Sequence, residues 1–133
     1  MKNHMRKPEF IILSAELSSL TGGENTFRTR NLVACLVDLG VKYTPVTGCY
    51  EGVEEISFMV MTPDESTFEA VRDLGLKSFN QDSILFRDYT GEAALYYGNG
   101  DYQPLGTFKQ VTKECAFFQD AYTKVNGAYW IVA

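Results

Sequence analysis

Residues 10–17 read FIILSAEL, in which four large apolar side chains are followed by Ser14, Ala15, Glu16 and Leu17. A short, continuous apolar run of this kind is typical of a strand that is buried on both faces. Ser14 and Glu16 make the far end of the same segment polar. We therefore predict a central strand whose far end leads into a polar region.

A long amphipathic helix is predicted after this strand. Residues 18–23 have the composition of a loop, and a helical pattern then runs from about Glu24 to Gly40. At about 100° per residue, Asn25 and Arg28 lie on the same face as the apolar positions, so the inward stripe becomes polar at its N-terminal end. The apolar positions of this stripe are Leu32, Cys35, Leu36 and Leu39.

Two strands and a second helix are predicted next. Residues 41–50 are interrupted by Pro45 and Gly48, which is typical of an edge or bulged strand. Residues 56–61 are apolar enough to form a central strand. The sequence Thr62-Pro63-Asp64-Glu65 predicts a helix start with Thr62 as N-cap, and Gly75 is expected to end this helix.

The last part of the chain predicts two hairpins and a third helix. Residues 83–86 and 93–97 have strand composition and are joined by a turn-rich link. A helical spacing begins at about Thr112, and near Ala121 it gives way to a hairpin whose turn is Asn126-Gly127.

The resulting order of elements is strand, helix, strand, strand, helix, strand. This order is typical of the split βαβ, ferredoxin-like class of α+β folds, a mixed sheet with both helices on one face. We therefore expect one α+β domain over residues 9–133, with a C-terminal extension made of a helix and a hairpin. Residues 1–8 are expected to form a flexible N-terminal arm.

Composition excludes several classes of protein. The 133 residues carry a formal charge of −5, which disfavours non-specific binding to nucleic acid. No stretch approaches 18 apolar residues and no signal peptide is evident, so we expect a cytoplasmic protein without a membrane span. His4 is the single histidine and no Cys-x-x-Cys pair occurs, so we expect neither a metal nor another cofactor.

The polar end of the first helix is the strongest candidate for a binding site. Free backbone N–H groups and the helix dipole favour an anion there, and Arg28 could hold a phosphate or a carboxylate with two hydrogen bonds. Alternatively, Asn25 or Thr26 is simply the N-cap, and Arg28 pairs with a nearby acid. In a split βαβ layout the ligand-binding residues would be Ser14, Glu16, Asn25, Arg28, Glu55 and Gln81.

Part of the chain resembles a family catalogued as domain of unknown function 3293, which occurs in bacteria and phages. The resemblance extends from Phe10 to about Phe86. It implies a bacterial or phage origin and no particular reaction. The matching positions are Ile12-Leu13-Ser14-Ala15-Glu16, Glu24-Asn25, Arg28, Leu32, Leu36, Gly48, Glu55-Ile56-Ser57-Phe58 and Phe79-Asn80-Gln81-Asp82-Ser83-Ile84, among which Asn25, Arg28, Glu55 and Gln81 are marked as family-type positions.

The function favoured by these residues is non-catalytic binding of a small, anionic, nucleotide-like ligand. For a phage protein, that ligand could be a host signalling nucleotide that is sequestered as a counter-defence. One alternative is an inhibitor that binds a host enzyme through the acidic, aromatic segment 89–102. A second alternative is a small enzyme for a phosphorylated substrate that uses Glu16 with Glu54 or Glu55. Assembly into a homo-oligomer stays open.

Overall fold

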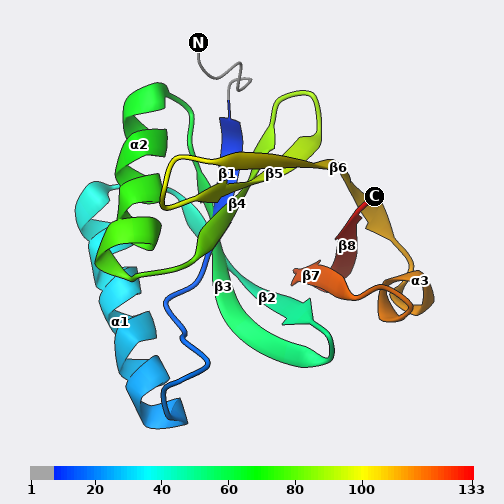
Figure 1. Cartoon of the computed structure of the whole chain (residues 1–133), viewed down its shortest axis with the longest axis horizontal. Coiled ribbons are helices and arrows are strands. Elements are labelled where there is room, and N and C mark those ends of the chain that lie inside the picture. The colour runs from blue at the N-terminus through cyan, green and yellow to red at the C-terminus, as the bar shows by residue number, and fades with distance from the viewer. Residues whose placement is uncertain (1–7) are drawn as a thin grey trace.

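Strand β1, which contains the apolar run, pairs on one side with β3 and on the other with β4. In the computed structural model, which describes residues 8–133, the strands close into one antiparallel barrel in the order β1-β3-β2-β7-β8-β6-β5-β4 (Figure 1). The strands are β1 (Pro8–Leu13), β2 (Tyr43–Tyr50), β3 (Val53–Met61), β4 (Ser83–Asp88), β5 (Glu92–Tyr97), β6 (Tyr102–Val111), β7 (Ala121–Val125) and β8 (Ala128–Val132). The helices are α1 (Gly22–Leu39), α2 (Glu65–Asp73) and α3 (Lys113–Phe117), and α2 runs into a π-helical turn, η1 (Leu74–Ser78).

The predicted ferredoxin-like α+β fold is wrong, because the sheet is a closed barrel with few helices. Helices α1 and α2 do lie together on one side of the sheet (Figure 1). However, the segments after residue 97 are not an extension, since β6, β7 and β8 supply three of the strands that close the barrel. Residues 1–7, which make up most of the predicted arm, lie outside the described residues.

Two apolar cores follow from the alternation of side chains along the strands. The outer core joins α1 and α2 to the outside of the barrel, through residues such as Leu32, Leu36 and Phe68 against Ile11 and Phe58. The inner core fills the barrel, and each of the eight strands contributes to it. Its residues are Phe10, Ile12, Val46, Met59, Leu85, Ala93, Phe108, Val125, Trp130 and Val132.

Strand β2 is an edge strand, as Pro45 predicted, only in its first half, because as a whole it pairs with both β3 and β7. The pairing with β7 covers only Thr47 to Tyr50. Pro45 therefore faces a neighbour on one side only, opposite Phe58 of β3, and its missing N–H interrupts no ladder.

Strand β6 was not predicted, because Pro104 and Gly106 interrupt its pattern. Its first half pairs with β5 and its second half with β8, so it turns a corner of the barrel. Gly106 lies at this corner with φ of 131°, and a β-carbon there would come within 2.8 Å of the backbone oxygen of Ala133. Only glycine fits both the backbone conformation and the close approach.

Both long helices begin at residues other than those predicted. The N-cap of α1 is Thr21, which forms a capping box with Glu24, so neither Asn25 nor Thr26 is the cap. The N-cap of α2 is Asp64, whose carboxylate accepts a hydrogen bond from the amide of Thr67 at 2.7 Å. Thr62 is not that cap, because it lies two residues earlier and its buried side-chain hydroxyl accepts no hydrogen bond from the helix.

Gly75 does not end α2, since that helix passes into η1 at Leu74. Gly75 is buried inside η1, and a β-carbon there would lie 3.0 Å from Ile84 Cγ2 and 3.1 Å from Leu13 Cδ1. The glycine therefore allows η1 to pack closely on β1 and β4, which is a packing requirement and not a stop signal.

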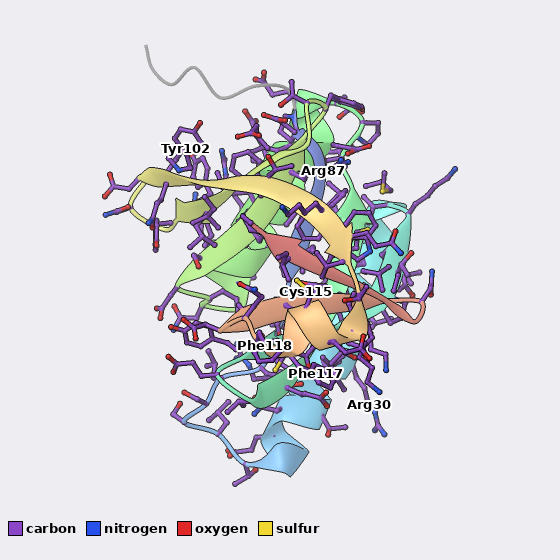
Figure 2. All side chains as sticks on the ribbon, turned by 90° about the vertical axis from the view of Figure 1, so that its right-hand side faces the viewer. Arg30, Arg87, Tyr102, Cys115, Phe117 and Phe118 are labelled. Carbon is purple, nitrogen blue, oxygen red and sulfur yellow. The ribbon has the colours of Figure 1, made fainter. Side chains whose placement is uncertain are left out.

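The hairpin predictions are confirmed. Strands β4 and β5 pair directly, and β7 and β8 are joined through Asn126 and Gly127, which have φ of 48° and 84°. Helix α3 begins after Thr112, as predicted, and its aromatic end carries Phe117 and Phe118 on one side of the barrel (Figure 2). Among the described residues, no helix has the length and apolar character needed to cross a membrane.

Candidate functional site

The loop after β1 brings all six of the predicted site residues together. Where β1 ends, the backbone of Ile56 in β3 has no strand partner on that side, and two side chains take its place. Ser14 Oγ donates a hydrogen bond to the carbonyl of Ile56 at 2.8 Å, and Glu16 Oε2 accepts one from its amide at 3.0 Å. The loop is thereby fixed against the start of β3.

Asn25 and Arg28 point inward, as predicted, but they bind backbone atoms of this loop and its surroundings. The Asn25 amide accepts from the amide of Leu17 at 2.8 Å and donates to its carbonyl at 3.0 Å. Arg28 Nε donates to the carbonyl of Ala15 at 2.6 Å, and Arg28 Nη2 donates to the carbonyl of Phe79. These contacts fix the conformation of the loop. They also occupy two donors of the Arg28 guanidinium, Nε and Nη2.

Gln81, like Asn25 and Arg28, binds the backbone of the loop. Its Nε2 donates to the carbonyl of Glu16 at 3.1 Å, and its backbone amide donates to the carbonyl of Gly75 at 3.0 Å. The amide side chain thus ties the start of β4 to the loop after β1. Of the six residues, Asn25, Arg28 and Gln81 hold the loop through its backbone, Ser14 and Glu16 join it to β3, and Glu55 lies beside them on β3.

Glu55 has a perturbed carboxyl group. Its side chain is half-buried, and burial together with the charge of Glu16 raises the pKa of Glu55, while a hydrogen bond with Ser14 partly offsets this rise. Two carboxylates that interact in a partly desolvated place produce a strongly negative potential. Such a place favours a cationic group, or a proton.

The alternation along β3 determines which way Glu55 points. Met59 packs into the inner core, so Ser57 and Glu55, two and four residues earlier, face the same interior side of the sheet. Glu54 and Ile56 face outward and are exposed. Glu55 therefore lies at one end of the barrel interior, beside Ser57, which is 5% exposed.

Gly48 and Thr123 complete this end of the barrel. Gly48 is the direct partner of Glu55 in the β2–β3 pair and of Thr123 in the β2–β7 pair. Directly paired residues point to the same face, so all three face inward. We name the barrel-end site as the set of Ser14, Glu16, Gly48, Glu55, Ser57 and Thr123.

Two hollows lie elsewhere, on the outer side of the barrel. One of about 560 Å³ is bordered by Glu54, Cys49, Tyr122 and Phe117, and a hydrogen bond with Cys49 raises the pKa of Tyr122 to about 12. The second, of about 190 Å³, lies beside Tyr102 and Asp88. In Figure 2, Tyr102 lies near the top of the view and Phe117 lies below its centre.

The barrel-end site has two acidic side chains, Glu16 and Glu55, and no histidine or cysteine. Among residues 8–133, no group of three or more histidine, cysteine or acidic side chains is placed to hold one. What the site offers is a pair of carboxylates, small hydroxyl groups and a stretch of uncovered backbone. This combination suits an organic cation more than a phosphate.

The sequence matches the model of the S-Adenosylmethionine lyase family over residues 11–133, which is nearly the whole chain. The chain belongs to the S-adenosylmethionine lyase family. No curated protein shows significant sequence similarity to it.

This membership corrects two predictions. The resemblance to domain of unknown function 3293 is wrong, and the bacterial or phage origin that it implied has no other support. The predicted non-catalytic, nucleotide-like ligand binding is also wrong, because an S-adenosylmethionine lyase is an enzyme. The alternative of an enzyme for a phosphorylated substrate is only loosely similar to this outcome.

The site also contains Gly48, Ser57 and Thr123, which are not among the residues predicted from the sequence. A signal for Ser57 was present, since the alternation over residues 53–61 puts it on the same face as Glu55. Thr123 offered no comparable signal. Its proximity depends on the pairing of β7 with β2, which joins segments more than 70 positions apart in the sequence.

Proposed function

We propose that this member of the S-adenosylmethionine lyase family cleaves S-adenosylmethionine at a carbon–sulfur bond, and that the barrel-end site is its active site. Family membership supports the reaction class. The half-buried Glu55 carboxyl group, with a pKa raised by burial and by the charge of Glu16, supports the location. The raised pKa of this half-buried carboxyl group is the observation that supports the proposed location of the active site.

The substrate carries its own leaving group and its own nucleophile. Its sulfur is a positively charged sulfonium, which leaves carbon as a neutral thioether. A lyase adds no water, so the broken bond must be replaced within the substrate. We propose that an oxygen of the methionine carboxylate attacks the γ-carbon and the electron pair of the Cγ–S bond moves to sulfur. The products are 5′-methylthioadenosine and a five-membered lactone of homoserine, with no proton gained or lost.

The changes of charge in this step indicate a role for the carboxylates of Glu16 and Glu55. The sulfonium and the substrate carboxylate lose their charges together, whereas the α-ammonium group keeps its charge throughout. A carboxylate beside the sulfonium would stabilise the reactant more than the transition state and would slow the reaction. We therefore assign Glu55 to the α-ammonium group, with Glu16 adding to the negative potential.

Arg28 fits this assignment because it is engaged elsewhere. A free guanidinium in the site would bind the substrate carboxylate and weaken it as a nucleophile. Arg28 instead donates to the carbonyls of Ala15 and Phe79. The substrate carboxylate is then free to reach the γ-carbon, and the protein contributes mainly by holding a reactive conformation.

The test is incubation of the full chain with S-adenosylmethionine in water enriched in oxygen-18, followed by mass spectrometry. Ring closure predicts 5′-methylthioadenosine and homoserine lactone without label in the ring oxygen, and later opening of the lactone adds label only to the carboxylate. Homoserine labelled in its hydroxyl group would show direct hydrolysis and contradict the lyase proposal. Vinylglycine would overturn ring closure, and an unchanged substrate would overturn the function.

A further inference from the structure

Gly48 is a glycine that the fold itself does not require. It lies in the middle of β2 and is absent from the positions of positive φ, so its backbone conformation is open to any residue. Glycine inside a strand weakens the strand relative to alanine. Such a glycine often marks a place where a ligand or another backbone approaches closely.

The space above Gly48 is not filled by the protein. A β-carbon there would lie 3.4 Å from Ser57 Oγ and 3.9 Å from the carbonyl oxygen of Glu55, and it would meet no other atom within 4 Å. Both distances are ordinary contacts, so a methyl group fits. Gly48 is also only partly buried. Packing within the chain therefore does not explain the missing side chain.

Gly75 and Gly106 provide the contrast. A β-carbon at Gly75 would lie 3.0 Å from Ile84, and one at Gly106 would lie 2.8 Å from the backbone of Ala133. Each of these glycines is required by a neighbour inside the protein. Gly48 has no such neighbour. Its position opposite Glu55 indicates that a bound molecule, and not the protein itself, requires the glycine.

We propose that the uncovered backbone of Gly48 is a substrate-positioning surface, over which the aliphatic chain of S-adenosylmethionine lies between its ammonium and sulfonium groups. This inference rests on the proposed function. Four bonds of about 1.5 Å or slightly more join the ammonium nitrogen to the sulfur, so an extended chain spans about 5 Å. Directly paired residues of two antiparallel strands are separated by about 4.5–5.5 Å. A substrate whose ammonium group is held by Glu55 of β3 thus carries its γ-carbon and sulfur across β2.

A side chain at position 48 would then occupy the space of the reacting carbons. Its effect should be greater on productive binding than on folding, because the site is open in the free protein and filled in the complex. Alanine at position 48 should already displace the aliphatic chain of the substrate, and valine should displace it further. Both residues favour strand conformation over glycine, so neither should weaken β2.

The experiment compares the full-length wild type with Gly48→Ala, Gly48→Val and the control Gly98→Ala. Gly98 is exposed beyond the end of β5, a β-carbon there meets nothing within 4 Å, and its φ is likewise outside the positive range. We expect KM for S-adenosylmethionine to rise about tenfold in Gly48→Ala and further in Gly48→Val. The Tm of both should be unchanged or higher, and Gly98→Ala should match the wild type in KM.

The outcomes separate the two proposals. If the wild type cleaves S-adenosylmethionine and Gly48→Ala keeps KM within about twofold, the role of Gly48 is overturned and the function stands. A joint loss of Tm and activity in both Gly48 variants would make Gly48 a structural residue and would also overturn the inference. A wild type that neither binds nor cleaves S-adenosylmethionine would overturn both proposals.

Discussion

The carboxylate of Glu16 accepts a hydrogen bond from the backbone amide of Ile56 at 3.0 Å, where β1 has ended and β3 has lost its strand partner. Ser14 completes the same exchange by donating to the carbonyl of Ile56 at 2.8 Å. Two side chains thus extend a β-ladder and, in doing so, set the position of the carboxylates at the barrel-end site. Structure and proposed chemistry therefore depend on the same contacts.

Ser14→Ala should destabilise the fold and also alter the site. The substitution removes the part-buried hydrogen bonds of Ser14 Oγ with the Ile56 carbonyl and the Glu16 amide, each of which contributes about 0.5–1.5 kcal/mol. It also removes the hydrogen bond that lowers the pKa of Glu55, so that pKa should rise further. Chemical denaturation and the pH dependence of activity measure the two effects. Ser19→Ala, an exposed change in the same loop, is the control and should leave both unchanged.

Glu55→Gln should lower lyase activity while Glu54→Gln should not. Hydrogen bonds to charged groups contribute about 1.5–3 kcal/mol, so kcat/KM for S-adenosylmethionine should fall about 10- to 100-fold when the carboxylate is lost. Glu54 precedes it on the same strand but faces outward and is exposed, which makes it a matched control. Equal losses in both variants would show that general charge, and not the barrel-end site, supports catalysis.

The raised pKa of Glu55 gives a pH dependence of stability with a definite sign. Burial and the charge of Glu16 raise this pKa above its ordinary value of 4.5, so the folded chain keeps a proton that the unfolded chain has already released. Stability from this group is therefore present at low pH and is lost as pH rises from 4.5 through the raised pKa. Relative to the wild type, Glu55→Gln should gain in Tm across that window. A difference in Tm that does not vary with pH would contradict this account.

Activity should show the opposite trend with pH. Binding of an ammonium group requires the charged form of Glu55, so kcat/KM should fall as pH drops through the raised pKa. The acidic limb of the pH profile should therefore lie above 4.5, the ordinary pKa of a glutamate. Glu54→Gln should retain this limb, and a limb unchanged in Glu55→Gln would assign it to another group.

Arg28→Ala should act mainly on stability. Arg28 donates to the carbonyls of Ala15 and Phe79, and loss of hydrogen bonds from a charged group costs about 1.5–3 kcal/mol each. Arg30 on the same helix is exposed, so Arg30→Ala is the matched control (Figure 2). Urea denaturation of the two variants measures the difference. If Arg28→Ala kept the wild-type midpoint and lost only substrate binding, Arg28 would be a ligand-binding residue after all.

Local patterns predicted many elements of this fold but not its closure. The apolar run at Phe10, the hairpin over residues 83–97 and the Asn126-Gly127 turn each carry a signal within a few residues. Strand β6 does not, because Pro104 and Gly106 break its alternation. Pro104 lies where β6 pairs with β5 alone, and Gly106 lies at the corner of the barrel. The pairing partners of β2 and β6 are set by tertiary packing, which a single sequence does not display.

The location of the site could be predicted from the sequence more readily than its chemistry. The helical spacing of Asn25 and Arg28 indicated that both point inward. Their partners are backbone carbonyls and amides of Ala15, Leu17 and Phe79, which no composition or motif identifies. An arginine near a helix start therefore predicts an anion site, whereas the groups that face the open space are acidic.

The strand order of the barrel also has a consequence for synthesis of the chain. Strands β2 and β6 are not neighbours until the hairpin of β7 and β8 inserts between them. While residues 121–132 are still within the ribosome, the emerging sheet presents two open edges that can pair with other chains. Closure then requires contacts between distant segments, which form slowly. Such a nascent chain should be most vulnerable to aggregation after β6 has emerged and before residues 121–132 follow, when a chaperone that shields strand edges would be of greatest benefit.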